Sequence, residues 1–580
     1  MKKLLIIAAI AAAAIGTYLF APAQKSPASY NVLDYIPADT PIFSGQLEPF
    51  PLKDYLSSAP VMPNRSEQQL LDDLYSQNNP KLDFFLNIFT TYQNSLQDPE
   101  LLIKTFGFPE QLRGYFYTLG LLPVLKIEIE NPQAVWDLLD KNELASGFMH
   151  SKGTLQSLDY RSYQLTDEGD SPQIELIVAI DKGLLTVTLN TPYTRQALLA
   201  TALGLSKVEN SLAASGQIEE ILSTHNFNQS SVAFINHTEL LKGFSTVNGN
   251  QLASDISTLE KQYRQVSPFA AIRNAQCESE LLSIAANWPR TVFGYTELAV
   301  SAEQSTLAAA GVVESKNQRI LKALQSIRGY IPEYVTALEQ SLLAVGFGFD
   351  INQLAASLND ILYDLQSPAY LCQPLAELQH KLSQSGGSIA MLAMGTSMAN
   401  GVKGISLGLF DYSIKQLNHA PALASLDALL TISADNPQQI FNSVKIFSSE
   451  LQQVELSDNG EEIDLTAILP IPAQYSLAPK LAIKGQQLLI YSGEKSKKIA
   501  ASLSSGLLNK NGMFKLSLDF KRMFTPIATA AQLAGQSIPE EAMFLRDYDA
   551  RMKMGLDINP QGIILDSYIN NKAGAVTAGH

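Results

Sequence analysis

The sequence contains few of the groups that usually carry catalysis or bind metals. Its 580 residues include only two cysteines and six histidines. No two histidines stand at the H-x-x-x-H spacing that places two ligands on one face of a helix. The segment 493–496 ends like a phosphate-binding loop but lacks the upstream glycine, and the segment 346–348 lacks the third glycine of a dinucleotide fingerprint. We therefore predict no metal site and no cofactor, and we assign no catalytic residue.

The chain also lacks an excess of positive charge. Its formal net charge is −15 at pH 7, whereas a general nucleic-acid binder needs lysine and arginine to neutralise phosphates. We therefore expect no nucleic-acid partner and no broad adhesion to an anionic membrane surface. Apolar residues make up 46% and charged residues 17%, which is typical of a folded globular chain. The length predicts two or three domains.

The N-terminus has the pattern of an export signal. Lys2 and Lys3 precede an uncharged apolar run, residues 4–20, which the small residues Ala21 and Ala23 follow. The run is longer than a usual signal core and approaches the length that spans a bilayer. Residues 1–23 are therefore either a signal peptide cleaved near Ala23 or an anchor in which residues 4–23 cross the inner membrane. A core helix of a cytosolic protein is a third interpretation. We expect a periplasmic protein.

The two cysteines, Cys277 and Cys372, form the only candidate disulfide. In an oxidising compartment an even count of two favours one bridge. Bridging them would close a loop of roughly 95 residues, which in the chain-entropy model stabilises the fold by about 4–5 kcal/mol. A redox-active pair usually has the C-x-x-C spacing, which is absent here, so we predict a structural bridge. Two buried free thiols are the alternative.

Four features recur in the same order, about 305 residues apart at first and about 260 at the last, which predicts a domain duplication. They are an Asn-Pro helix start, a hairpin, a strand leading into a helix, and a closing hairpin. The first copies occupy residues 130–136, 174–189, 231–241 and 291–313, and the second copies occupy residues 435–441, 481–492, 514–523 and 551–569.

The predicted fold is α+β, with two related lobes of antiparallel sheet faced by helices and a helical central region. We place a first lobe with helical insertions at residues 24–335 and the second lobe at residues 336–580. Residues 40–47 are predicted to form the first strand and residues 64–119 to be helical, because Phe84, Phe85 and Ile88 lie on one helical face.

Two motifs could be taken for catalytic sites. Gly404–Gly408 fits G-x-S-x-G, the nucleophile elbow of hydrolases, but the surrounding residues alternate like one continuous strand. We interpret Ser406 as a strand residue on the polar face. Lys126, Glu128 and Glu130 alternate with apolar residues, and we interpret them as the solvated face of a half-buried strand rather than as an acid–base pair.

The chain resembles a family of uncharacterised bacterial exported proteins, known as a domain of unknown function. The resemblance rests on a Pro-Ala-Asp-Thr box at residues 37–40, on residues 119–125, 129–132 and 178–181, and on residues 211–232 leading into a strand. It covers most of residues 35–315 and, more faintly, the second copy. The family implies an exported protein and brings no known reaction, cofactor or functional residue.

The leading hypothesis is a non-catalytic bacterial envelope protein that binds a protein partner or a ligand. The alternatives are an envelope hydrolase with a dispersed site, and a carrier of small molecules or lipids that uses the cleft between the lobes. A buried polar cluster would favour the enzyme, a large apolar groove the carrier, and an exposed apolar patch a partner.

Overall fold

The structure is a computed structural model that describes residues 31–59, 74, 79–167, 169, 172–263, 267–384, 386–417, 420–468, 477–533 and 540–573. The predicted export segment, residues 1–23, lies outside these ranges. Within them, no helix has the length and apolar character needed to cross a membrane. The chain divides into two compact units, a first lobe of Met1–Gly311 with Ala575–His580 and a second lobe of Val312–Gly574. This division lies earlier in the chain than the predicted boundary after residue 335.

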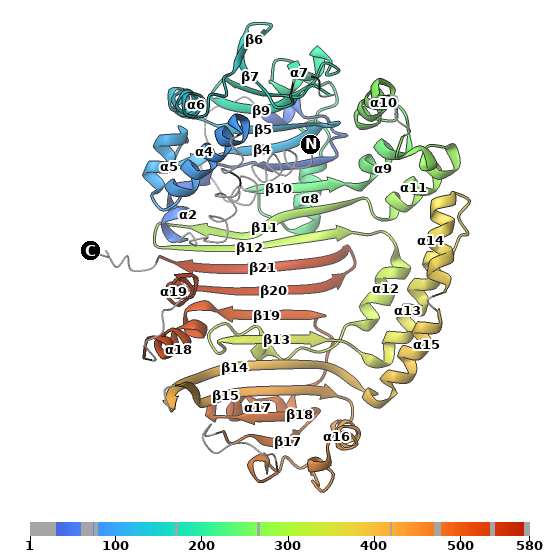
Figure 1. The fold of residues 1–580 in the computed structure, drawn as a ribbon. Coiled ribbons are helices and arrows are strands. Elements are labelled where there is room, and N and C mark those ends of the chain that lie inside the picture. Colours follow the sequence, from blue (N-terminus) through green and yellow to red (C-terminus); the bar gives the residue numbers. More distant parts are fainter. Residues whose placement is uncertain are drawn as a thin grey trace. The chain divides into compact units, whose positions relative to one another are not determined.

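The first lobe is built on one antiparallel sheet (Figure 1). Its strands follow one another across the sheet in the order β6 (Ser151–Leu155), β7 (Leu158–Gln164), β8 (Glu175–Asp181), β9 (Leu184–Asn190), β5 (Leu122–Glu128), β4 (Gly114–Leu119), β1 (Ile42–Gln46), β10 (Ser231–Asn236) and β11 (Arg290–Val300). Strand β12 (Gln304–Glu314) follows β11 after a tight turn in which the amide of Ser301 donates to the carbonyl of Gln304. A small second sheet pairs β2 (Phe50–Pro51) with β3 (Gln111–Leu112).

Nine helices of the described residues accompany this sheet. They are α2 (Leu52–Ser58), α4 (Pro80–Ser95), α5 (Pro99–Phe106), α6 (Pro132–Ser146), α7 (Gln196–Ala202), α8 (Gln217–His225), α9 (His237–Ser245), α10 (Gln251–Tyr263) and α11 (Ala275–Asn287). The prediction that residues 64–119 are helical is confirmed at α4 and α5 and wrong at residues 114–119, which form β4. There Tyr115 and Tyr117 alternate with a period of two and pair between β1 and β5.

Helices cover both faces of the first sheet. On one face α4, α5 and α6 pack Phe84, Leu102 and Val135 against strand residues that include Ile127 and Val178. On the other face Leu199 and Leu203, from α7 and its C-terminal end, pack against Ile177 and Ala179 of β8.

The solvated-face interpretation of β5 is therefore wrong at Lys126. This lysine is only 1% exposed, Glu128 is half-buried in an ion pair with Arg113, and Glu130 alone is exposed. The physical reason is that the Lys126 face of β5 is covered as well as the Ile127 face. Alternation identified the two faces of the strand but not their exposure.

The second lobe repeats the arrangement (Figure 1). Its strand order is β16 (Ile463–Asp464), β17 (Lys480–Lys484), β18 (Gln487–Ser492), β15 (Ala420–Ala434), β14 (Val402–Leu417), β13 (Leu343–Gly348), β19 (Phe514–Asp519), β20 (Ala550–Asn559) and β21 (Gly562–Lys572). Its helices are α12 (Gln318–Ile327), α13 (Ile351–Gln366), α14 (Gln373–Ser383), α15 (Gly386–Gly395), α16 (Pro437–Lys445), α17 (Glu494–Ser502), α18 (Phe520–Leu533) and α19 (Glu540–Asp547), with short 3-10 helices η3 (Glu333–Val335) and η4 (Thr396–Ala399).

The shared strand order confirms the two related lobes. Strand β1 lies between β4 and β10, as β13 lies between β14 and β19. Helices α6 and α16 both begin with a proline after an asparagine cap, Asn131 or Asn436, whose side chain accepts the amide three residues on. The predicted central helices are α12 to α15, which precede β14 in the chain.

Candidate interaction surface

The two predicted disulfide residues are both buried. Cys277 lies in the first turn of α11, where its amide donates to Asn274 Oδ1 at 2.9 Å, and Cys372 immediately precedes α14. Among the described residues neither is a free thiol. The structure therefore supports a disulfide-capable pair, and the bridge from Cys277 to Cys372 stays a prediction for chemical mapping.

The G-x-S-x-G motif lies inside strand β14, as predicted. Its serine, however, does not lie on an exposed polar face: Ser406 is 2% exposed, whereas Ile405 and Leu407 are the exposed residues. The reason is η3, which crosses this face and brings the Tyr334 hydroxyl to 2.9 Å from Ser406 Oγ, to which it donates, and 3.1 Å from Thr431 Oγ1. The serine is thus a satisfied core hydroxyl without an elbow geometry.

One buried polar cluster lies in the first lobe, between α6 and β7. Glu143 is buried and accepts from the Tyr163 hydroxyl at 2.7 Å and from Arg161 at 3.1 Å, with His150 Nδ1 at 2.8 Å. Burial raises the pKa of the Tyr163 hydroxyl well above its ordinary value. The carboxylate therefore has three partners within the cluster, which fits a structural role in joining the helix to the strand.

The histidines that the structure describes do not gather into a metal site. His150, His225, His237 and His380 are described, whereas His419 and His580 lie outside the described residues. Among the described residues, no group of three or more His, Cys, Asp or Glu side chains could hold a metal ion.

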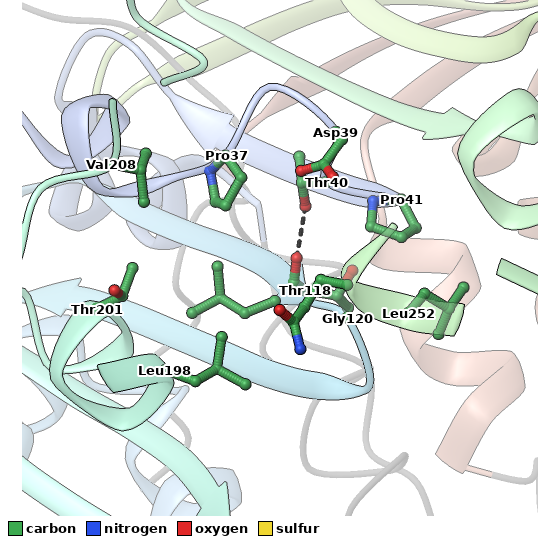
Figure 2. Close-up of a pocket in the computed structure, with 12 residues that line it drawn as sticks. Pro37, Asp39, Thr40, Pro41, Thr118, Gly120, Leu198, Thr201, Val208 and Leu252 are labelled. Atoms are coloured by element: carbon green, nitrogen blue, oxygen red, sulfur yellow. Dashed lines mark hydrogen bonds between the residues drawn. The ribbon is translucent and has the colours of Figure 1, made fainter. Parts of the chain in front are cut away.

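A small pocket in the first lobe is lined by the Pro-Ala-Asp-Thr box (Figure 2). Its volume is about 280 Å³, and Pro37, Asp39 and Thr40 lie on one side with Leu198 and Thr201 opposite. The Thr40 hydroxyl donates to the Thr118 carbonyl at 2.7 Å and so holds the box against the end of β4. This volume is below the range of most drug-sized ligand sites, so the pocket gives little support to a carrier.

The pocket wall at Gly120 depends on a glycine. Gly120 has a φ of +62°, and a Cβ there would stand 2.1 Å from Asp255 Oδ2. That carboxylate accepts the Leu121 amide at 3.0 Å, and burial raises the Asp255 pKa. Residues 119–121, which belong to the family resemblance, therefore form a tight turn supported by a half-buried acid.

A group of exposed apolar side chains follows α13, α14 and α15 of the second lobe. Helices α14 and α15 both pack against α13 (Figure 1). Large apolar side chains on these helices and their connections are exposed to solvent. We call them the apolar surface: Tyr363, Leu365, Leu371, Leu378, Met391, Leu392, Met394 and Met398. Extended exposed apolar patches on soluble proteins usually mark interaction sites.

The helices that carry this surface are held in place by polar contacts. Asp350 caps α13 by accepting the Asn352 amide at 3.2 Å, and Asn352 Oδ1 in turn accepts the Gly401 amide at 2.9 Å. At the opposite end, Gln379 of α14 donates to the carbonyls of Leu365 and Pro368 at 3.0 and 2.8 Å. These contacts fix the start of α13 to the residue before β14 and fix α14 to the end of α13.

Helix α13 carries two carboxylates, one of which is paired with a cation, and α15 carries no charge. Asp360 lies 3.6 Å from Arg319 Nη2, and Asp364 Oδ2 accepts from the Asn317 side chain at 2.6 Å. The Arg319 guanidinium also stacks 4.2 Å from the centre of the Tyr363 ring. Helix α15 itself contains no charged residue.

Comparison with known proteins assigns no family. No family model and no curated protein match the chain. Solved structures that match include two crystal forms of TP0453. Crystal form III is 10% identical with a TM-score of 0.23 and covers 52% of this chain and 90% of its own; crystal form I is 10% identical with a TM-score of 0.21 and covers 50% and 80%. We base no argument on likenesses of this size.

Proposed function

We propose that this protein is a non-catalytic envelope protein that acts by binding, and that the apolar surface on α13–α15 is its binding surface. The observation that carries the proposal is the exposure of Met391 and Met394, which are 69% and 70% accessible on a helix without charge. Leaving such side chains in water costs free energy that a partner surface would recover. The envelope location rests on the export pattern of residues 1–23.

Two further observations support binding over catalysis. The hydroxyl of Ser406 is engaged by Tyr334, and the carboxylate of Glu143 is engaged by three side chains, so neither group is placed to attack a substrate. The pocket beside residues 37–40 is small, whereas the exposed apolar side chains are distributed over α13, α14, α15 and their connections.

Site-directed photo-crosslinking in intact cells tests this proposal. A benzoylphenylalanine residue at position 394 should form a defined adduct with protein or lipid. The matched control carries the same residue at Leu144, which is 80% exposed on α6 of the first lobe and should give no adduct. A full-length, exported protein that forms no adduct from positions 391, 394 and 398 would contradict the proposal.

A further inference from the structure

We infer that the apolar surface docks onto a phospholipid bilayer, with α15 lying in the boundary between headgroups and acyl chains. The inference rests on the proposed binding function and names its partner. It concerns an association at the membrane surface and does not require any part of the second lobe to cross the bilayer.

The first argument is the distribution of apolar side chains around α15. Ile389 is half-buried, whereas Met391, Leu392 and Met394 are exposed and point in directions spread over nearly half of the helix circumference. A helix that docks into a groove of a protein partner usually has one apolar stripe and a polar back. In the sequence, residues 389–394 are all apolar over more than one helical turn. A helix that is apolar all round suits an environment of low polarity, such as the acyl-chain boundary.

The second argument is the length of chain without charge. No charged residue occurs between Lys381 and Lys403, and the stretch contains α15, η4 and their connections. Burying a charged side chain in the bilayer is costly, so an uninterrupted neutral stretch is what insertion requires. The small polar residues within it, such as Ser388 and Thr396, stand at the ends of the apolar segment.

The third argument is depth. Helix α15 has ten residues and is therefore about 15 Å long, well short of the roughly 20 residues that span a bilayer. A helix lying in the interface enters only about 5–10 Å, which is the reach of methionine and leucine side chains on one helix. The backbone here is helical, so its polar groups are satisfied internally.

The charge pattern also predicts which lipid headgroups the surface contacts. His380 and Lys381 at the end of α14 are the exposed basic residues beside α15, and no basic cluster flanks it. With a chain of net charge −15, attraction to anionic headgroups is not the driving force. We therefore expect binding to zwitterionic phosphatidylcholine vesicles that changes little with added salt or with added anionic lipid.

The test places a fluorescent reporter on the surface of the full chain. Residues 4–23 are themselves expected to bind vesicles, so the readout must be local. Dansylalanine at position 394 should shift to shorter wavelength when phosphatidylcholine vesicles are added, and doxyl groups near the top of the acyl chains should quench it. The same label at Leu144 should not respond. With the label at Leu378, the Met391→Asp/Met394→Asp variant should bind about tenfold more weakly or worse.

Each outcome decides between the proposals. A response at position 394 but not at 144 supports the lipid partner. Equal responses at both positions show unspecific adsorption and overturn it, as does no response at 394. If the label at position 394 does not respond to vesicles but crosslinking in cells from this position yields one protein adduct, the lipid inference is wrong and the binding function stands. If both experiments fail, both proposals fall.

Discussion

Replacing Lys126 by methionine should stabilise the first lobe at neutral pH. Lys126 is buried in β5 opposite Tyr115 of β4, and its Nζ donates to Thr186 Oγ1 at 2.8 Å. Among the described residues, no carboxylate lies within ion-pair distance of it. Burial lowers the pKa of Lys126 to about 7, while Asp181 opposes the shift and Lys182 adds to it. Methionine keeps the apolar stem and removes the charge.

The magnitude follows from linkage between protonation and folding. Between pH 7 and 10.5 the unfolded chain keeps the lysine proton and the folded chain has lost it, so the unfolded state binds more protons and stability rises with pH. At about 1.4 kcal/mol per pH unit, the interval from about 7 to 10.5 corresponds to roughly 5 kcal/mol. The advantage of Lys126→Met should therefore be about 4 kcal/mol at pH 7 and should fade towards pH 10.5.

Urea denaturation followed by tryptophan fluorescence can measure this effect. Both tryptophans, Trp136 and Trp288, belong to the first lobe, so the signal reports the lobe that contains Lys126. The matched control is Lys152→Met, which replaces an exposed lysine on β6 and should give no comparable stabilisation at pH 7. If the free-energy difference between Lys126→Met and the parent chain does not vary with pH, the ammonium group is not buried as described.

Three other predictions concern the disulfide, the serine and export. Cys277 and Cys372 should appear as one linked peptide pair in unreduced mass spectra, and replacing both by serine should lower the unfolding free energy by about 4–5 kcal/mol; two freely alkylated thiols in envelope-purified protein would end the idea. Ser406→Ala should cost about 1 kcal/mol, because the Tyr334 hydroxyl keeps Thr431 as a partner, and a fluorophosphonate probe should not label the parent chain; labelling that Ser406→Ala abolishes would restore the nucleophile. A phosphatase fused after residue 60 should be active outside the cytoplasm, and an inactive phosphatase with an active cytosolic reporter would refute export.

The sequence predicted the repeated order of elements because those signals are local. An asparagine cap followed by proline, as at Asn131 and Asn436, marks a helix start without reference to the rest of the chain. Alternation likewise marked β5 and β14 as strands. It could not show which face is buried, because burial depends on segments distant in sequence, such as α7 in one lobe and η3 in the other.

The apolar surface was missed for a related reason. A membrane-spanning helix needs about 20 mostly apolar residues, and the stretch between Lys381 and Lys403 does not supply them because glycine, serine and glutamine interrupt it. The absence of charge over this stretch was readable. The exposure of Met391 and Met394 could not be predicted from the sequence, because it depends on how α14 and α15 pack on α13.

The two lobes show how one structural position accepts different buried polar groups. The amide of Asn236, which caps α9, donates to the Pro41 carbonyl, and the amide of Asp519, which caps α18, donates to the Leu342 carbonyl. These matching hydrogen bonds align β1 with β13. Counting across the paired strands from there makes Lys126 equivalent to Thr431.

The same alignment makes Tyr115 equivalent to Ser406 and Tyr117 equivalent to Gly408. In the first lobe β4 places the bulky Tyr117 at this position, and Lys126 has one hydroxyl partner, Thr186. In the second lobe a glycine stands in that place; a Cβ there would lie 2.9 Å from the Tyr334 ring, which enters from η3 and satisfies two hydroxyls. At this position the second lobe buries only neutral groups. The pH dependence predicted for Lys126 should therefore be confined to the first lobe.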